Sequence, residues 1–300
     1  MKKVASLMVV LAGVLWGTSG IFVKFLTPYG FSPLQLTLCR ALVSTLVIAV
    51  VLLIKDRTLF RVSPKNLVFM ALTGISFFGS AASYYSAMQI TTISTAVVLM
   101  YSFPVFVVLI SVLFMGEKFS KIKALAIGGV VVGCALVSGV ASGLDFTSVP
   151  GILLPLLASL CLVPYTLFTR LCAERGCSPL TTTFYTCLFF LLPAVLFSRP
   201  WEMPALIAQA PWPILPLGIG LGICTFILPY FLYAFGMKSI PAGTASALSI
   251  SEPLAATLFS VLFFSEPMDI PMAIGAVLIL LAVFLLGREE TQKINKERTQ

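Results

Sequence analysis

Full charges inside long apolar runs are the residues that could do chemistry in this chain. Glu252 lies near the middle of one such run, and Lys24 and Arg40 lie in two others. An ionised carboxylate at mid-membrane costs about 2.5–3.5 kcal/mol on insertion scales, so Glu252 is expected to face the protein interior. Two interpretations of Glu252 stay open. It either binds a substrate ammonium or a proton, or it is a structural partner of Arg40 or of broken backbone.

Lys24 and Arg40 are both expected in the outer half of the membrane. Arg40 is six residues past the start of its run, which is roughly 9 Å deep at 1.5 Å per residue. Lys24 either reaches the outer headgroups or faces a cavity, whereas Arg40 pairs with Glu252 or with helix carbonyls. Ser249 shares a helical face with Glu252. If the three charges face one cavity, that cavity suits an organic anion or a zwitterion such as an amino acid.

Aromatic residues with polar tips form a second candidate set. They lie away from the ends of the runs, whereas aromatic belts favour the membrane interfaces. Each is therefore expected to line a cavity or to pack in the core. The set is Trp16, Tyr84, Tyr101, Tyr165, Tyr230 and Tyr233.

Pro104 and Pro253 occupy matching places in two of the runs. An internal proline removes a backbone hydrogen bond and kinks the helix. Freed carbonyls at membrane depth are tolerated only where protein or a cavity supports them. Both prolines are therefore predicted helix-kink sites where the two halves of the chain meet, although proline is also common in membrane helices in general.

Several kinds of chemistry are disfavoured. The chain has no His, which excludes imidazole bases and His metal sites. Its seven Cys form no CxxC, and no P-loop, GxSxG or HExxH occurs. We therefore expect no catalytic residues, no metal, no cofactor and no ATP-driven transport by this chain alone, and we interpret the chain as a protein that is not an enzyme.

Composition indicates the environment. The 300 residues are 59% hydrophobic and 10% charged, and the mean hydropathy is +1.07. A soluble domain carries about a quarter charged residues. We read ten apolar runs, each long enough to approach a membrane crossing, at 4–26, 34–54, 67–88, 94–115, 124–141, 151–169, 179–198, 212–236, 243–264 and 270–287. The predicted fold is an all-α membrane protein with ten transmembrane helices, which leaves no room for a soluble domain.

The basic residues predict the orientation. With the N-terminus inside, 16 of the 19 Lys and Arg fall on the inner side, and only Arg199 falls in an outer loop. This bias in short loops places both termini in the cytoplasm. It also explains the net charge of +8 without a nucleic-acid partner. Residues 288–300 are read as a charged cytosolic tail.

The two halves of the chain resemble each other. Residues 84–117 match 233–266 at 13 of 34 positions, at an offset of 149 that also pairs Trp16 with Tyr165. Five spans in each half is an odd number, so the halves insert upside down relative to each other. Inverted repeats are typical of alternating-access carriers. A channel or scramblase-like protein and a membrane enzyme stay as alternatives.

These motifs resemble the drug/metabolite transporter superfamily, EamA family. The resemblance rests on Leu15-Trp16-Gly17-Thr18 with Lys24, on Arg40-Ala41, on Pro104 before Gly116-Glu117, and on Pro253 before Ser265-Glu266. It implies a ten-helix carrier built from two inverted five-helix repeats, at 1–142 and 149–287. It also implies a cavity lined mainly by helices 1, 3, 4, 6, 8 and 9, with helices 5 and 10 at the periphery.

The sequence thus predicts a secondary transporter of small organic metabolites in the cell membrane, most simply an exporter of amino acids or related compounds. A sugar-phosphate, drug or lipid-linked substrate is the alternative. The expected partners are a small-molecule substrate and the lipid bilayer, with H+ as an open choice of coupling ion. Gly129 and Gly133 form a GxxxG pair. Such pairs let helices pack closely within a monomer, and a weak homodimer is the second reading.

Overall fold

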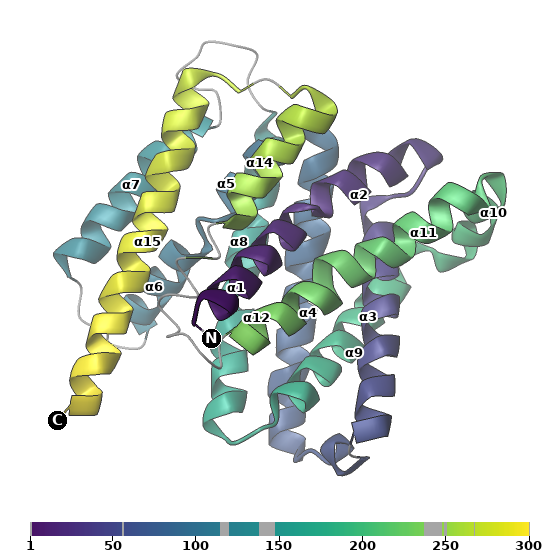
Figure 1. The fold of residues 1–300 in the computed structure, drawn as a ribbon, viewed down its shortest axis with the longest axis horizontal. Coiled ribbons are helices and arrows are strands. Elements are labelled where there is room, and N and C mark those ends of the chain that lie inside the picture. Colours follow the sequence, from purple (N-terminus) through teal and green to yellow (C-terminus); the bar gives the residue numbers. More distant parts are fainter. Residues whose placement is uncertain are drawn as a thin grey trace.

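The protein is helical throughout the part of the chain that the structure describes. The computed structural model describes residues 2–55, 57–114, 120–137, 148–236, 248, 251–266 and 268–299, and no β-strand occurs within these ranges. Figure 1 shows the helices as an elongated bundle. The α-helices are α1 (Lys2–Gly17), α2 (Ser19–Leu26), α3 (Pro33–Lys55), α4 (Pro64–Ile90), α5 (Ile93–Met100), α6 (Phe103–Phe114), α7 (Lys121–Val137), α8 (Val149–Glu174), α9 (Pro179–Ser198), α10 (Met203–Gln209), α11 (Pro211–Gly222), α12 (Leu228–Gly236), α14 (Ser251–Phe264) and α15 (Ile270–Thr299). The short elements are the 3₁₀ turns η1 (Thr27–Tyr29), η2 (Arg57–Phe60) and η3 (Pro200–Glu202) and the π-helical turn η4 (Ile223–Ile227).

Six helical segments are long and apolar enough to cross a membrane. They are Lys3–Tyr29, Pro33–Lys55, Pro64–Ile90, Val149–Thr169, Pro179–Ser198 and Pro211–Tyr233. Three further helical segments are also apolar but shorter, namely Ile93–Val107, Ser251–Phe264 and Ile270–Leu285. The protein is therefore a multi-pass membrane protein, while the full count of ten spans stays a prediction. The runs 124–141 and 243–264 lie partly outside the described residues.

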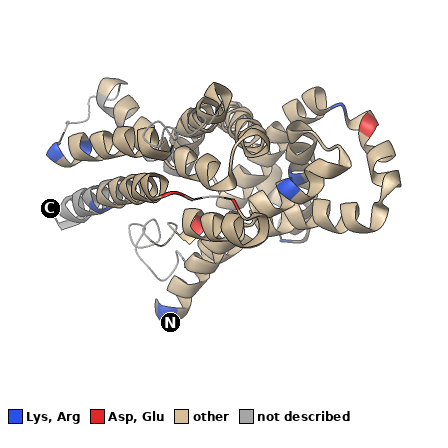
Figure 2. Ribbon diagram, turned by 90° about the horizontal axis from the view of Figure 1, so that it is seen from above, with Lys and Arg blue, Asp and Glu red and all other residues tan. Residues whose placement is uncertain are grey.

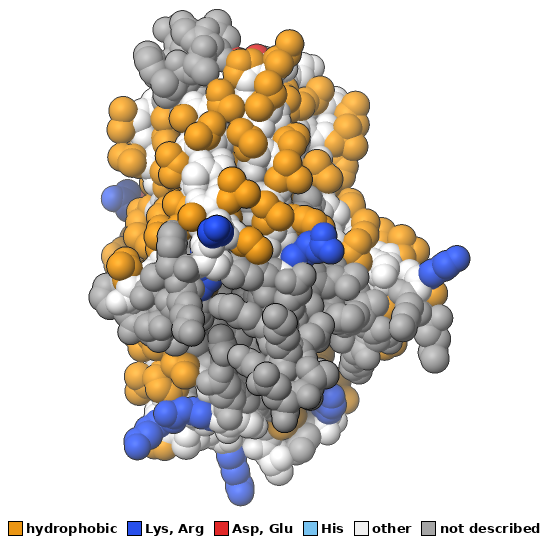
Figure 3. Space-filling model, turned by 90° about the vertical axis from the view of Figure 1, so that its left-hand side faces the viewer, with side chains coloured by type: hydrophobic (Ala, Val, Ile, Leu, Met, Phe, Trp, Pro, Cys, Tyr) orange, Lys and Arg blue, Asp and Glu red, His pale blue; other side chains and the backbone are white. Residues whose placement is uncertain are grey.

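The outer surface suits lipid. Large apolar side chains are exposed on several helices, for example Leu46, Leu125 and Phe231 at 65%, 67% and 68%. Figure 3 shows hydrophobic side chains spread over the upper half of one face, and Figure 2 shows how few charged residues the described helices carry. In water this surface would be costly, so it is expected to contact acyl chains.

Proline marks where several helices begin. Pro33, Pro64, Pro179 and Pro211 each occupy the first position of their helix. A proline is well tolerated there because the first N–H groups of a helix have no intrahelical partner. Proline therefore favours the start of each of these four helices.

Helix breaks occur inside three of the expected runs. The regular α-helix is interrupted at Thr18, at Tyr101–Ser102 just before Pro104, and at the π-turn η4 just before Pro229. Pro253 lies in the first turn of α14, where its missing N–H breaks no helical hydrogen bond. The residues before α14 that would report a kink, 249–250, lie outside the described residues.

Helices from the two halves pack against each other. α4 lies between α8 and α9, α9 also packs on α3, and α1 packs on both α12 and α14. α7 and α15 pack on each other along one edge of the bundle, as Figure 1 shows at its left. This is the peripheral place that the resemblance implied for the fifth and tenth helices.

Glycines allow the α7–α15 pair to approach closely. A Cβ added at Gly133 would lie 2.6 Å from Cγ1 of Ile279 and 2.8 Å from the carbonyl oxygen of Gly275. A Cβ added at Gly128, on the same helix, would meet nothing within 4 Å. Gly133 of the predicted GxxxG pair therefore packs within the monomer, against α15.

We predict that Gly133→Ala lowers the melting temperature in detergent while Gly128→Ala does not. Overpacking costs about 1–3 kcal/mol, whereas Ala is favoured over Gly in a helix by about 1 kcal/mol. The two variants share the propensity gain and differ only in the clash. Equal melting temperatures for the two variants would contradict the close α7–α15 contact.

Candidate functional site

A cavity of about 370 Å³ lies between the helices of the two halves. Its lining comes from α1, α2, α3, α4, α5, α6, α8, η4, α12, α14 and α15 and from the break at Tyr101. Eight of the ten residues predicted to bind substrate line it: Trp16, Arg40, Tyr84, Tyr101, Tyr165, Tyr230, Tyr233 and Glu252. Arg40 and Val283 come from the second and tenth runs, which were not among the helices implied to form the cavity.

Glu252 enters the cavity from the first turn of α14. Its Oε2 accepts a hydrogen bond of 2.7 Å from the hydroxyl of Tyr101. A carboxylate in the first turn of a helix is also favoured by the helix dipole. α1 comes very close here, because a Cβ on Gly17 would lie 2.9 Å from the Glu252 carbonyl oxygen. Glu252 thus accepts a hydrogen bond from a neutral donor at the break between α5 and α6.

Arg40 is held by aromatic faces and by two long hydrogen bonds. Its guanidinium carbon lies 5.3 Å from the ring centroids of both Phe77 and Phe226. Its Nη1 donates to the Tyr85 hydroxyl and its Nη2 to the Thr225 carbonyl oxygen, each at 3.4 Å. A guanidinium is suited to this place, because it stacks on aromatic faces and is weakly hydrated.

The carbonyl that Arg40 binds is made available by a proline. In a regular helix, the Thr225 carbonyl accepts from the N–H of residue 229. Residue 229 is Pro, which has no N–H, and the chain forms the π-turn η4 at this point. Pro229 and the π-turn therefore present a backbone acceptor to the cation at membrane depth.

Arg40 and Glu252 line one cavity without forming an ion pair. Neither residue has an ion-pair partner among the described residues. Of the partners predicted for Arg40, the structure has the helix carbonyl. The structural pairing of Glu252 with Arg40 is not formed here, because each charge is compensated by neutral groups on its own side.

Aromatic rings build the rest of the wall. The Trp16 ring lies 5.3 Å from that of Tyr230 and 5.6 Å from that of Tyr233, between centroids. Tyr165 packs on Phe77 at 4.7 Å, and its hydroxyl lies 3.4 Å from that of Tyr230. The wall thus combines flat apolar faces with hydroxyl groups, which suits an organic ligand with a few polar groups.

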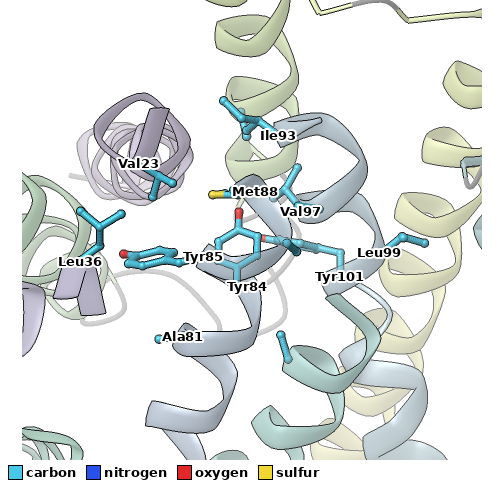
Figure 4. Packing of buried hydrophobic residues seen from close by; sticks show 14 of the residues in the cluster. Val23, Leu36, Ala81, Tyr84, Tyr85, Met88, Ile93, Val97, Leu99 and Tyr101 are labelled. Atoms are coloured by element: carbon cyan, nitrogen blue, oxygen red, sulfur yellow. The ribbon is translucent and has the colours of Figure 1, made fainter. Parts of the chain in front are cut away.

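Two buried donors of the wall make no hydrogen bond of normal geometry among the described residues. They are Nε of Arg40 and the hydroxyl of Tyr84, a residue only 6% exposed whose hydroxyl has the Ser19 side chain nearby. Figure 4 shows Tyr84 between Tyr85, whose ring points toward Leu36, and Tyr101 on the other side. Buried polar groups are usually hydrogen-bonded, so these donors are available to a ligand or to water.

One predicted residue lies away from this cavity, and another lies outside the described residues. Lys24 does not line it, and instead its Nζ lies 3.2 Å from Oε1 of Glu266. Ser249 lies outside the described residues. Sequence reasoning missed the Phe77–Phe226 clamp and did not identify Thr225 as the source of the helix carbonyl that binds Arg40. Pro229 was the available signal for the carbonyl, since it identifies the acceptor four residues earlier.

We predict that Glu252→Gln keeps the detergent melting temperature close to that of the unchanged protein. Its partner is the Tyr101 hydroxyl, which also donates to an amide oxygen. Breaking a buried ion pair from one side would instead cost about 3–5 kcal/mol. A large loss of stability that Arg40→Gln then recovers would contradict the unpaired arrangement.

The comparisons with known proteins agree with this geometry. The profile of the EamA-like transporter family matches residues 3–139 and 149–288. The chain is 30% identical to an uncharacterized transporter of Archaeoglobus fulgidus, covering 94% of this chain and 95% of the relative. It is 25% identical to the uncharacterized transporter YwfM of Bacillus subtilis, covering 95% and 94%.

A solved crystal structure shares the fold. It is 21% identical to this chain, with a TM-score of 0.59, and the match covers 95% of this chain and 98% of the other. At this identity the likeness bears on the fold alone. The profile match spans nearly the whole chain and confirms the resemblance drawn from the motifs. The chain therefore belongs to the EamA-like transporter family.

Proposed function

We propose that this protein is a secondary transporter that exports amino acids or related small metabolites by alternating access. The observation that carries the proposal is one cavity holding a carboxylate and a guanidinium that do not pair with each other. A zwitterion presents the complementary charges. Its ammonium would bind at Glu252 and its carboxylate at Arg40, while its side chain would lie on the aromatic wall.

The size and polarity of the cavity support a small organic ligand. A volume of about 370 Å³ is within the usual range for small-molecule sites, about 300–1,000 Å³. The hydroxyl of Tyr84 and Nε of Arg40 add donors for a carboxylate. Aromatic rings favour a ligand with an apolar or flat body.

The proposed architecture is ten helices in two inverted five-helix repeats, at 1–142 and 149–287, followed by the charged tail 288–300. The double match of the family profile supports the duplication. The packing also supports it, because contacts recur when equivalent helices are exchanged. The contact of α1 with α14 corresponds to the contact of α8 with α5 and α6. The contact of α4 with α8 corresponds to the contact of α12 with α1. α3–α9, α5–α14 and α7–α15 are each formed by equivalent helices.

In this mechanism the chain binds, orients and shields the substrate between two repeats that rock against each other. Glu252 and Arg40 would bind the ligand's charges, and the aromatic wall would exclude water from its body. A second role for Glu252 follows from the same geometry. If it takes up a proton when the substrate leaves, the proton and the ammonium compete for one carboxylate, which would couple export to H+ entry.

We predict that Glu252→Gln reduces flux of amino acids at least tenfold, since the loss of roughly 1.4 kcal/mol is enough. The assay is flux in proteoliposomes across a metabolite panel. For the best amino acid, we would also test the amine that lacks its carboxylate and the acid that lacks its amino group. Glu252→Gln should lower the flux of both ammonium compounds and leave that of the acid unchanged.

Glu202→Gln is the matched control, because Glu202 is an exposed carboxylate paired with Arg199. It should leave all three fluxes unchanged. If Glu252 also carries the proton, the wild-type flux should depend on pH and that of Glu252→Gln should not. Equal loss for all three compounds would contradict ammonium binding at Glu252. Flux of sugar phosphates, drugs or lipid-linked compounds alone would favour the alternative substrates, and a new chemical product would indicate an enzyme.

Both termini are proposed to be cytoplasmic, with the chain in the cell membrane. We predict that single cysteines at Lys121 and Gly176 are labelled only from the cytoplasmic side. A cysteine at Arg199 should be labelled only from outside. The test uses a membrane-impermeant thiol reagent on intact cells and on inverted vesicles, in a background without the seven native cysteines. Labelling of Lys121 and Gly176 from opposite sides would overturn the proposed topology.

A further inference from the structure

A buried carboxylate joins three helices at one end of the bundle. Glu266 follows α14, and its Oε1 lies 3.2 Å from Nζ of Lys24 on α2. Its Oε2 accepts a 2.8 Å hydrogen bond from the N–H of Ile93, the first residue of α5. The hydroxyl of Ser260 donates to the same oxygen. We call these four residues, Lys24, Ile93, Ser260 and Glu266, the outer latch.

The backbone is shaped to bring Glu266 into this place. Ser265 has φ of 50°, the left-handed conformation that usually ends a helix at glycine. The N–H of Ser265 bonds to the Val261 carbonyl and that of Glu266 to the Ser260 carbonyl, at 3.1 and 3.4 Å. This turn directs Glu266 back over the end of α14. Ser265 occupies the position equivalent to Gly116 at the offset of 149, and it forms a left-handed turn although it is not a glycine.

The latch binds across the two halves of the chain. Lys24 and Ile93 belong to the first half, and Glu266 and Ser260 to the second. The carboxylate is only 10% exposed and the lysine 30%. The negative charge also lies at the N-terminus of α5, where the helix dipole favours it. Glu266 therefore stabilises one relative position of the two halves.

The latch lies beyond the cavity along two helices. Lys24 is five residues past Ser19, and Ile93 is seven residues before Met100, and both Ser19 and Met100 line the cavity. Five to seven residues of helix rise about 8–10 Å. The positive-inside orientation places this end of the bundle on the outer side of the membrane.

Two glycines make close contacts between the latch and the cavity. A Cβ on Gly17 would lie 2.9 Å from the backbone N of Ala256, and one on Gly20 would lie 2.6 Å from Cγ2 of Ile93. α1 and α2 therefore touch α14 and α5 at this level. A ligand cannot pass here unless these helices separate, and separation would break the latch.

We propose that Lys24 and Glu266 form an outer gate that keeps the cavity closed to the outside until α14 moves away from α2 and α5. The proposal rests on the carrier function and orientation proposed above, but it concerns different residues. It assigns Lys24 a gating role and not a substrate-binding one. The ion pair biases a two-state equilibrium, so its loss raises the population that is open to the outside.

The test measures access to the cavity from outside and needs no substrate. Ser80 lines the cavity and is only 3% exposed. Ser80→Cys would be introduced in a background without native cysteines that keeps the wild-type melting temperature. Its labelling rate by a membrane-impermeant thiol reagent would be measured on intact cells and on inverted vesicles. Because the readout is labelling, a wrong substrate class would not affect it.

Lys24→Gln and Glu266→Gln each remove the ion pair while a Gln at 266 still accepts from the Ile93 N–H. Each is expected to raise labelling from outside about two- to fivefold, the size that a partly exposed pair supports. Labelling from the inner side should fall or stay level. The double variant should exceed neither single variant, because both act through one interaction.

Arg199→Gln is the matched control, since it removes an exposed ion pair, to Glu202, expected on the same side. It should leave the labelling rate unchanged. If Glu266→Gln fails to fold, Lys24→Gln still tests the proposal with the Glu266 contacts to Ile93 and Ser260 intact. Unchanged labelling in folded variants would overturn the gate and leave the pair a structural contact. A rise from the inner side alone would overturn the outer position of the gate and with it the proposed orientation.

Discussion

The cost of holding charge away from water is the constraint on which the cavity depends. The charge of Arg40 is stabilised by two aromatic faces, a tyrosine hydroxyl and a backbone carbonyl. That of Glu252 is stabilised by one tyrosine hydroxyl and the start of a helix. Because neutral groups compensate both charges, neither neutralises the other. Both therefore stay available to a ligand, together with the donors of Tyr84 and Arg40.

The same constraint acts on the backbone. Unsatisfied carbonyls and N–H groups are tolerated at membrane depth only where protein or a cavity supports them. The three helix breaks, at Thr18, at Tyr101–Ser102 and in η4, each adjoin residues that line the cavity. In η4 the benefit is specific, because the carbonyl that Pro229 cannot bind becomes a ligand for Arg40. Irregular backbone is thus concentrated where polar groups are needed.

Small residues decide how the two halves meet. Gly17 and Gly20 bring the first span against α14 and α5, and Gly133 brings α7 against α15. The first contact lies between the cavity and the outer latch, whereas the second lies at the edge of the bundle. Close packing at the first level places Lys24 and Glu266 within 3.2 Å of each other, on helices from the two halves.

The sequence by itself determined the environment and the candidate residues. Composition required a membrane, and mid-run charges and aromatics with polar tips identified eight of the 18 residues that line the cavity. The charges were identifiable because an ionised side chain is too costly to face lipid. The prolines of the sequence also indicated where helices are interrupted.

Which residues contact each other was decided only by the tertiary structure. Helical periodicity predicts which face of a helix is buried but not which residues lie opposite that face. It therefore could not decide whether Glu252 contacts Arg40 or Tyr101, which is 151 residues away in the sequence. Periodicity also could not predict the contact of Lys24 with Glu266. That contact depends on how α2 packs against α14 and on the left-handed turn at Ser265.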